Sequence, residues 1–258
     1  MDLDLAGKVV LVTGGSDGLG RAVCRSLVSE GASVALCARD VDRLEATARE
    51  LRASGGNVLD VAADVTRLDD LRRFVDEAME RFGRIDGLVN NAGRSSAKLL
   101  ANSEDGDFYE DMDLKLHSAV RLTRLALPEL RRTRGSVVNV LAISAKTPGA
   151  GSTPTSVSRA AGLALSKALS KELGPSGIRV NAVLVGYIES AQWERRAAAT
   201  SVSPEELYAQ IARDADIPLG RVGAAQEFAD LVVYLLSSRA SYVTGVGVNV
   251  DGGACAVV

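Results

Sequence analysis

The chain has little of what metal centres, disulfide scaffolds and membrane spans require. It holds one histidine, His117, and three scattered cysteines, Cys24, Cys37 and Cys255. Metal sites and disulfide frameworks need Cys or His at short, repeated spacings, so we expect no metal and reduced thiols. No apolar run approaches the roughly 20 residues that cross a bilayer, and the acidic start MDLDLAGKVV lacks the basic region of a signal peptide. These absences predict a cytoplasmic protein without a membrane partner.

An excess of positive charge is also missing. The formal net charge is −3, and the short basic runs Arg72-Arg73 and Arg131-Arg132 lie on amphipathic segments, where we interpret them as solvated faces. We therefore expect no nucleic-acid partner. Hydrophobic residues make up 47% of the 258 residues, which suits one globular core, since undivided α/β folds commonly reach about 200 to 250 residues. We expect a single domain over residues 1–258.

Short β-branched runs alternate with longer segments of helical periodicity. The predicted strands cover Lys8–Thr13, Ser33–Ala38, Asn57–Ala62, Gly87–Asn90, Ser136–Leu141, Arg179–Val185 and Val246–Val250. The first predicted helix has an apolar face of Leu19, Ala22, Val23, Ser26 and Leu27. The other predicted helices cover residues 41–53, 68–82, 107–132, 155–173 and 224–237. Nearly continuous apolar strands favour a parallel sheet with both faces covered. The order predicts an α/β fold, a doubly wound parallel sheet of the Rossmann type in three α/β/α layers.

One insertion, residues 186–219, carries no strand pattern. Within it, Ser203-Pro204-Glu205-Glu206 has the features of an N-cap, a proline at the first helical position and a capping-box glutamate, so a short helix begins there. An insertion at the carboxyl edge of a parallel sheet is placed to cover a ligand, and we expect a substrate lid. Trp193 either lines the pocket or anchors the lid.

A glycine-rich turn follows the first predicted strand. Residues 13–20 read TGGSDGLG, and they join a strand to a helix. Glycines let the backbone turn sharply and approach a pyrophosphate, which then meets the free N–H groups of the helix. Glycines also serve turns without a ligand, but this position favours phosphate binding.

Further motifs identify the family. Asp64-Val65 follows the third strand, NNAG (residues 90–93) ends the fourth, and YVTGVGVNVDGG covers residues 242–253. With TGxxxGxG, these motifs closely resemble the short-chain dehydrogenase/reductase family from Lys8 to Gly253. The resemblance implies one Rossmann-type domain, a nicotinamide cofactor, a small-molecule carbonyl or alcohol substrate, and a homotetramer or homodimer built partly from the fourth and fifth helices.

The resemblance also assigns cofactor contacts position by position. The residues implied to hold the phosphates are Gly14, Ser16, Asp17, Gly18 and Leu19. Those implied along the adenine, the ribose and the central part of the cofactor are Asp64, Val65, Asn91, Ala92 and Gly93. In VLVGYIES, Val185-Gly186 stands where the family has Pro-Gly, which implies Gly186, Ile188 and Ser190 near the carboxamide.

The choice between NADP and NAD depends on the end of the second strand. An acid there would bind a free ribose 2′-hydroxyl, but the chain has Ala38-Arg39-Asp40, and Arg39 suits a 2′-phosphate. This favours NADP. NAD stays the alternative, because Asp40 suits a 2′-hydroxyl and Asp17 stands where many NADP-using members have a basic residue.

The four catalytic positions of the family are all substituted. Its asparagine, serine, tyrosine and lysine fall on Lys115, Ala142, Thr155 and Arg159. The reaction needs a group that exchanges a proton near the working pH, but a threonine hydroxyl is a poor acid and arginine stays protonated. The usual proton transfer is therefore not implied here.

Two interpretations stay open. In the first, the protein is a divergent oxidoreductase in which Arg159 grips the ribose and substrate, while another group or water supplies the proton. Lys115 is the main candidate, because burial beside Arg159 would lower its pKa. A salt-bridged helix lysine is the structural alternative for Lys115. Tyr187 and Lys146 are weaker candidates, and His117 points to another helix face.

In the second, the chain is a non-catalytic dinucleotide-binding protein, which acts as a pseudoenzyme, a sensor or a partner in a mixed oligomer. Lys115 discriminates between the two. A lysine that projects into the pocket favours the enzyme, and one that is paired at the surface favours the binding protein.

Overall fold

Seven parallel strands form one sheet. The computed structural model of the chain describes residues 2–189 and 202–258. The strand order is β3-β2-β1-β4-β5-β6-β7, and every neighbouring pair is parallel. The bounds are Val9–Thr13 (β1), Ser33–Ala38 (β2), Val58–Ala62 (β3), Gly87–Asn90 (β4), Ser136–Ala142 (β5), Arg179–Val185 (β6) and Gly247–Val250 (β7). This confirms the doubly wound sheet, and the strand ends differ from the prediction by at most one residue.

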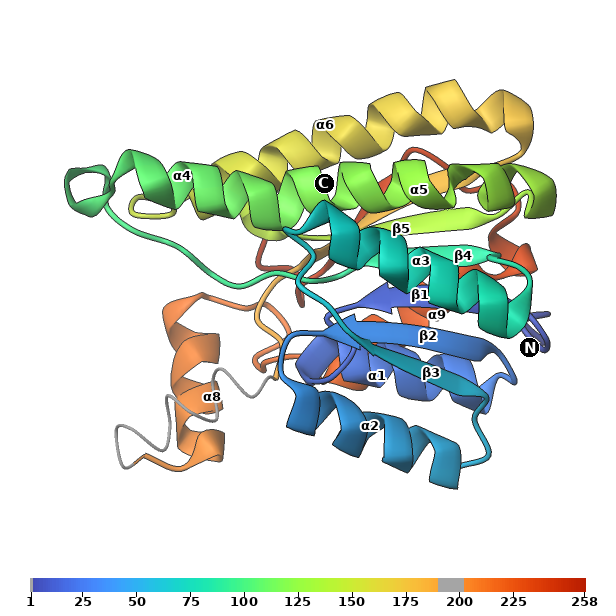
Figure 1. The fold of residues 1–258 in the computed structure, drawn as a ribbon. Helices are drawn as coiled ribbons and strands as arrows, with labels where there is room; N and C mark the ends of the chain where they lie inside the picture. The colour runs from blue at the N-terminus through green and yellow to red at the C-terminus, as the bar shows by residue number, and fades with distance from the viewer. Residues whose placement is uncertain (1, 190–201) are drawn as a thin grey trace.

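Helices cover both faces of this sheet (Figure 1). Their bounds are Gly18–Ser29 (α1), Val41–Ala53 (α2), Leu68–Phe82 (α3), Asp105–Met112 (α4), Ser118–Thr133 (α5), Thr155–Leu173 (α6), Pro204–Asp214 (α8) and Ala225–Leu236 (α9). Short helical turns are η1 (Leu100–Asn102), η2 (Asp113–His117), η3 (Ile143–Ala145), η4 (Gly174–Ser176) and η5 (Ser238–Ala240). None of the helices in the described ranges is both long and apolar enough to span a membrane.

The core consists of two main apolar layers, one on each side of the sheet. Val10 and Val12 of β1 point to the layer that contains Phe228 of α9, with α1 and α2. Their neighbours Val9 and Leu11 point to the layer built around α3 and α5. Alternate residues of one strand face opposite sides, so each strand serves both layers. This explains why the strands have nearly continuous apolar sequences.

The segment 107–132, which we predicted as one helix, is interrupted. α4 ends at Met112, a π-helical turn (η2) covers Asp113–His117, and α5 begins at Ser118. A π turn closes i→i+5 hydrogen bonds and accommodates one extra residue while the helix continues along its direction. The apolar period of the flanking turns is preserved, so periodicity alone did not reveal it. Such turns are frequent at functional sites, and this one carries Lys115.

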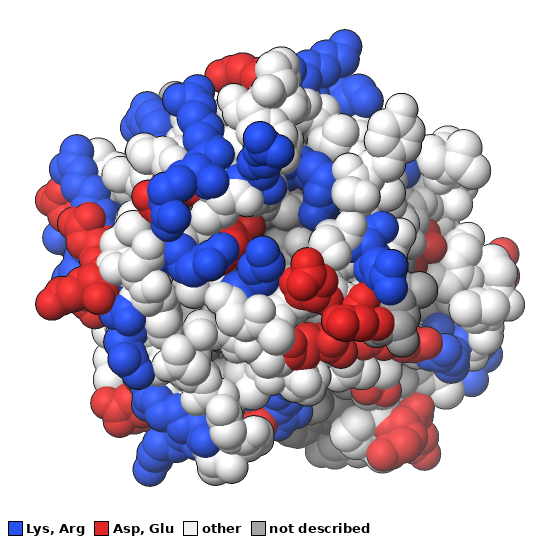
Figure 2. Space-filling view, turned by 90° about the vertical axis from the view of Figure 1, so that its right-hand side faces the viewer, with Lys and Arg blue, Asp and Glu red and all other residues white. Residues whose placement is uncertain are grey.

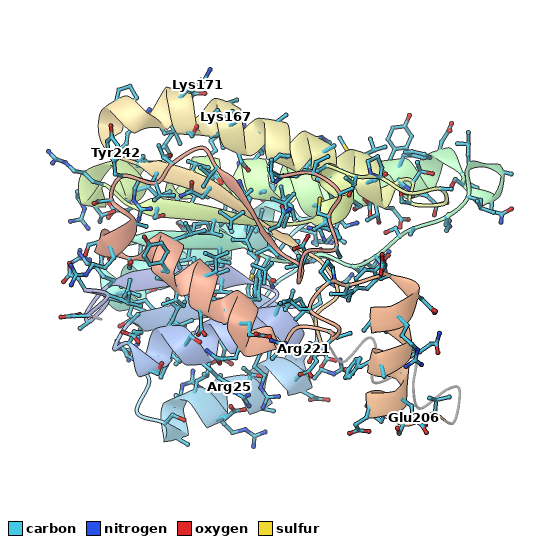
Figure 3. All side chains as sticks on the ribbon, turned by 180° about the vertical axis from the view of Figure 1, so that it is seen from behind. Arg25, Lys167, Lys171, Glu206, Arg221 and Tyr242 are labelled. Atoms are coloured by element: carbon cyan, nitrogen blue, oxygen red, sulfur yellow. The ribbon has the colours of Figure 1, made fainter. Side chains whose placement is uncertain are left out.

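The helix predicted inside the lid is present as α8. The Ser203 side chain accepts a hydrogen bond from the Glu206 backbone, and the Glu206 side chain bonds back to the Ser203 backbone, which confirms the capping box. α8 stands to one side of the sheet (Figure 1), with Glu206 at its outer end (Figure 3). Ser190 and Trp193 lie outside the described residues, and the function of 186–219 as a lid stays a prediction.

Candidate functional site

The glycine turn is held by the segment after β4. Asn91 donates from Nδ2 to the carbonyl oxygens of Thr13 (2.9 Å) and Gly14 (3.1 Å), and Thr13 Oγ1 accepts from the backbone N–H groups of Asn91 and Ala92. Gly14 has a φ of +66°, and a Cβ on Gly20 would lie 2.1 Å from the Gly14 carbonyl oxygen. Only glycine fits at both positions. The turn is therefore fixed against the start of α1, where Asp17 is the N-cap and accepts from the Gly18 N–H at 2.8 Å.

A hollow of about 330 Å³ opens beside this turn, at the carboxyl ends of the strands. Six predicted cofactor residues line it, namely Gly14, Ser16, Arg39, Val65, Ala92 and Gly93. Leu114 and Arg94 complete its inner wall. The structure thus brings six of the fifteen predicted cofactor residues together around one hollow. The bare glycine backbone leaves room there for a pyrophosphate next to the N-terminus of α1. The residues present fit a dinucleotide.

Basic side chains surround the outer end of the hollow. Arg39, at the end of β2, lies 3.9 Å from Asp64, and Arg43, in the first turn of α2, lies 3.4 Å from Asp17 and 3.2 Å from Asp40. The acids that argued for NAD are therefore both paired with Arg43, which sequence reasoning missed. The sequence does contain a sign of this contact, because a second arginine stands four residues after Arg39, in the first turn of the next helix.

Asp64 is held in place rather than directed into the hollow. Its carboxylate accepts from the N–H and hydroxyl of Thr66, at 3.0 and 2.8 Å. Burial alone would raise the pKa of Asp64, but these hydrogen bonds and the charges of Arg39 and Arg67 outweigh it and hold the pKa below its ordinary value. Asp64 therefore keeps its charge and orders the loop that follows β3.

Three of the substituted catalytic positions meet at the inner end. Thr155 is the first residue of α6, Arg159 follows one turn later, and Lys115 reaches them from η2. The Lys115 Nζ lies 3.1 Å from Thr155 Oγ1, and its side chain is 2% exposed. The Arg159 Nη1 donates to the Val140 carbonyl at 2.6 Å, while its Nε is buried without a partner among the described residues. Ala142, at the end of β5, supplies no hydroxyl to this group.

A buried carboxylate that the sequence analysis missed lies beneath them. Asp111 of α4 accepts from the Lys115 Nζ (2.5 Å), Ser96 Oγ (2.6 Å) and Ser158 Oγ (2.5 Å). Ser96 also donates its backbone N–H to Thr155 Oγ1 at 2.8 Å. The signal was the i,i+4 spacing of Asp111 and Lys115, but the same spacing is common in exposed ion pairs. Lys115 therefore forms an ion pair, as the alternative of a salt-bridged helix lysine predicted. The pair is buried and does not lie at the surface.

Burial sets the direction of the pKa shifts of the two cations in this cluster, and hydrogen bonds set that of the carboxylate. It lowers the pKa of Lys115 to about 8, helped by the Arg159 charge and opposed by Asp111. Burial also lowers the pKa of Arg159 to about 10, which leaves the guanidinium protonated at neutral pH. For Asp111, burial favours a higher pKa, but hydrogen bonds from Lys115, Ser158 and Ser96 outweigh it and hold the pKa below its ordinary value. The expectation that burial beside Arg159 lowers the Lys115 pKa is therefore confirmed.

The other candidates lie elsewhere or have structural contacts. His117 is exposed and lies 3.3 Å from Asp113, and Lys146 donates to Gly247 and Asn249 of β7. The Tyr187 carbonyl accepts a hydrogen bond from the Gly223 N–H at 3.0 Å. Of the residues implied near the carboxamide, Ile188 is buried against Gly223, and Gly186 packs so closely on Asp251 that a Cβ would come within 2.6 Å. These two shape the backbone after β6.

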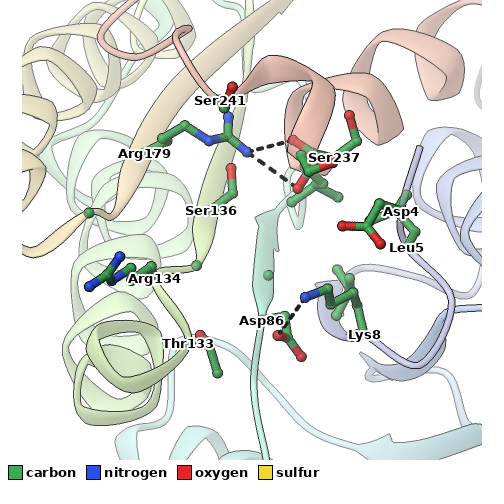
Figure 4. Close-up of a pocket in the computed structure, with 16 residues that line it drawn as sticks. Asp4, Leu5, Lys8, Asp86, Thr133, Arg134, Ser136, Arg179, Ser237 and Ser241 are labelled. Atoms are coloured by element: carbon green, nitrogen blue, oxygen red, sulfur yellow. Dashed lines mark hydrogen bonds and ion pairs between the residues drawn. The ribbon is translucent and has the colours of Figure 1, made fainter. Parts of the chain in front are cut away.

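A second hollow, of about 260 Å³, lies at the opposite end of the sheet (Figure 4). Arg179 there donates to the carbonyls of Leu235, Leu236 and Ser237, and Asp86 pairs with Arg84 and Lys8. The end of the molecule that carries the N-terminus shows acidic and basic side chains intermixed (Figure 2). The polar groups named here already have protein partners, so we assign them to structure.

Together, the fold and the glycine-turn hollow define a dinucleotide-binding protein of the Rossmann type. The model of the family described as Enoyl-(Acyl carrier protein) reductase matches residues 14–255. The chain is 37% identical over 254 residues to L-fucose dehydrogenase of Bos taurus, which covers 96% of this chain and 90% of that protein.

Two solved structures are similar throughout. A short chain oxidoreductase from Pseudomonas aeruginosa PAO1, described as NADPH-bound and as containing an atypical catalytic center, superimposes with a TM-score of 0.94 at 35% identity and covers 99% of each chain. L-sorbose reductase from Gluconobacter frateurii, complexed with NADPH and L-sorbose, gives 0.94 at 33% identity and covers 100% of both chains. The chain belongs to the short-chain dehydrogenase/reductase family, and it is an NAD(P)-dependent oxidoreductase.

Proposed function

We propose that the protein is an NADP-dependent oxidoreductase that interconverts a small carbonyl compound and its alcohol, with Lys115 as the proton source in place of the family's tyrosine. The observation that carries this proposal is the position of the Lys115 Nζ, buried and 3.1 Å from the hydroxyl at the family's tyrosine position. A lysine whose pKa is near 8 is protonated at neutral pH and still gives up its proton readily.

The cofactor preference is supported by two arginines. Arg39 and Arg43 line the outer end of the hollow, where a 2′-phosphate would meet two guanidinium groups instead of an acid. The two solved relatives described above both hold NADPH. When bound, such a cofactor supplies or accepts the hydride. This chain's residues hold it through the glycine turn, the N-terminus of α1 and the buried Arg159, whose Nε has no partner among the described residues.

The Thr155 hydroxyl is the final donor in this proposal. Its oxygen accepts one hydrogen bond from the Ser96 N–H and one from the Lys115 Nζ, and these two bonds occupy both of its lone pairs. No acceptor for its own hydrogen lies among the described residues, so that hydrogen is available to a substrate oxygen. As the alcohol forms, the Thr155 proton passes to that oxygen and a Lys115 proton replaces it. Threonine alone is too weak an acid, but the ammonium behind it corrects this deficit.

A non-catalytic binding protein is the second candidate. It is favoured by the buried ion pair of Lys115 with Asp111, because a lysine that is held by a buried aspartate also serves packing alone. Under this alternative the protein binds the dinucleotide and does not turn it over.

The experiment combines direct binding with turnover. NADPH affinity is measured by fluorescence titration, and NADPH oxidation is followed with a panel of ketones, keto acids and sugars, for the wild type, Lys115→Met and Thr155→Val. We expect kcat to fall by about 10²- to 10⁴-fold in Lys115→Met, with little change in NADPH affinity. Lys171→Met, on the exposed side of α6 (Figure 3), is the matched control and should keep full activity.

Two results would contradict the proposal. Tight NADPH binding without turnover of any substrate would support the binding protein. Turnover that survives Lys115→Met would remove the proposed proton source.

The assembly and location of the protein stay predictions. We propose the homotetramer or homodimer and the cytoplasmic location that the sequence indicated. Analytical ultracentrifugation tests the assembly, and a monomer at micromolar concentration would contradict it.

A further inference from the structure

Asp111 is a charged group that the proton transfer described above does not by itself require. It is 2% exposed, and its carboxylate accepts three side-chain hydrogen bonds from two helical segments and a loop. A buried charge costs several kcal/mol unless its partners compensate it, and an apolar side chain fills the same space without that cost. A carboxylate kept at this position therefore suggests a role beyond packing.

The partners of Asp111 connect Lys115 to the surface. Lys115 and Ser96 both bond to Oδ1, at 2.5 and 2.6 Å, so a single oxygen joins the ammonium to a hydroxyl. Ser96 is half-buried and is flanked by the exposed residues Ser95 and Ala97. Ser158, which bonds to Oδ2, is 1% exposed. The only other side-chain hydrogen bond of Ser158 among the described residues is to the Thr155 carbonyl, so it does not lead to solvent. Ser96 is thus the link between Asp111 and solvent in the described network.

We propose that Asp111 is a positioning residue for this reaction, and that with Ser96 it forms the route by which a proton returns from solvent to Lys115. This inference rests on the proposed function. Its carboxylate holds the Lys115 Nζ against Thr155 Oγ1 and fixes the direction of the transfer.

The step balances without any redox change. After reduction, the Lys115 Nζ is a neutral amine. The Ser96 hydroxyl passes its proton to the Asp111 carboxylate at Oδ1 while hydronium or a buffer acid supplies a proton to Ser96 Oγ. The proton on Oδ1 then passes to Nζ, which leaves Asp111 a carboxylate again. One proton enters for each alcohol formed. In alcohol oxidation the same route runs outward.

The charges around Lys115 predict the direction in which its pKa moves when Asp111 loses its charge. Asp111 of α4 faces the ammonium with a negative charge, while Arg159 of α6 and Arg94 of the loop after β4 face it with positive charges. Removing the charge of Asp111 leaves the two cations unopposed. The ammonium then loses its proton at a lower pH.

The test is the titration of Lys115 in the protein without substrate. The chain has only six lysines, so ¹³C,¹⁵N-lysine labelling gives few ¹³Cε signals, and Lys115→Arg assigns the one of interest. We expect the midpoint of Lys115 to fall by about one pH unit or more in Asp111→Asn. Asp113→Asn, which removes a nearby carboxylate paired with Arg121, should leave it unchanged. An unmoved midpoint in Asp111→Asn would overturn the positioning role.

A second variant tests the route and keeps the ion pair intact. Ser96→Ala removes the hydroxyl but leaves Lys115 on Asp111, and Ser96→Thr restores a hydroxyl. We expect kcat to fall in Ser96→Ala, to recover with added imidazole as a diffusible proton donor, and to stay near the wild-type value in Ser96→Thr. A kcat for Ser96→Ala that equals the wild type and is independent of buffer concentration would overturn the route.

The two proposals fail in different ways. If Lys115→Met retains turnover, the proposed function is wrong. If Lys115→Met is inactive while Asp111→Asn leaves the Lys115 midpoint unmoved, the proposed function stands and only the role of Asp111 is wrong.

Discussion

The substitutions at the catalytic positions compensate one another. Threonine at 155 is shorter than a tyrosine, and Lys115 places its ammonium directly behind the shorter side chain. Arginine at 159 keeps a positive charge that does not titrate near neutral pH, and that charge lowers the pKa of Lys115. Asp111 then stabilises a second cation in the same buried space. Each of these residues depends on the others, so restoring only a tyrosine at 155 would not restore the family's usual site.

A residue-scale prediction concerns Arg39. Its guanidinium lines the outer hollow, and a charge-assisted hydrogen bond contributes about 1.5–3 kcal/mol. Arg39→Ala should therefore weaken NADPH binding about 10- to 100-fold at low ionic strength and leave NADH binding nearly unchanged. Isothermal titration with both cofactors measures this. Arg49→Ala, exposed on the same α2, is the control, and equal losses for NADPH and NADH would contradict the assignment.

At the scale of elements, the contact between the glycine turn and α1 gives a sharper prediction. A Cβ on Gly20 would lie 2.1 Å from the Gly14 carbonyl oxygen and 2.5 Å from the Asn91 Nδ2, so the turn or the helix must move. Gly20→Ala should therefore lose most cofactor affinity while the protein stays folded, as titration and circular dichroism would show.

The control for this substitution is another helical glycine. A Cβ on Gly106 of α4 meets nothing within 4 Å, so Gly106→Ala should stabilise the protein by about 0.5–1 kcal/mol and keep cofactor binding. Unchanged affinity in Gly20→Ala would show that the turn is more adaptable than this packing indicates.

Sequence periodicity predicted the elements well because each strand and helix has its own apolar pattern. It failed at η2, since a π turn adds one residue without altering the pattern on either side. Asp111 was missed for a different reason. Its meeting with Ser96 and Ser158 depends on how α4, α6 and the loop after β4 pack, which no local pattern encodes. Lys115 was found because the family resemblance marked its position.

At the scale of the whole molecule, the Lys115–Asp111 pair is buried between the sheet and its helices. Two main apolar layers hold the strands, and the ends of β4 and β5 and the helices α4 and α6 converge on Lys115. A single buried lysine in such a scaffold connects its protonation to the stability of the entire fold.

The last prediction follows from this connection. Burial lowers the pKa of Lys115 from its ordinary value of 10.5 to about 8, so below pH 8 both folded and unfolded chains carry the proton. Between about pH 8 and 10.5 the unfolded chain holds this proton and the folded chain does not. The free energy of unfolding therefore increases as the pH rises through this range.

Relative to Lys115→Met/Asp111→Asn, which removes both partners, the wild type should gain about 1 kcal/mol per pH unit in this window, and the gain disappears as the pH falls through 8. Urea unfolding followed by circular dichroism at pH 7, 8, 9 and 10 measures the difference. A difference that is constant from pH 7 to 10 would show that Lys115 keeps an ordinary pKa, and it would then be too weak an acid for the proposed transfer.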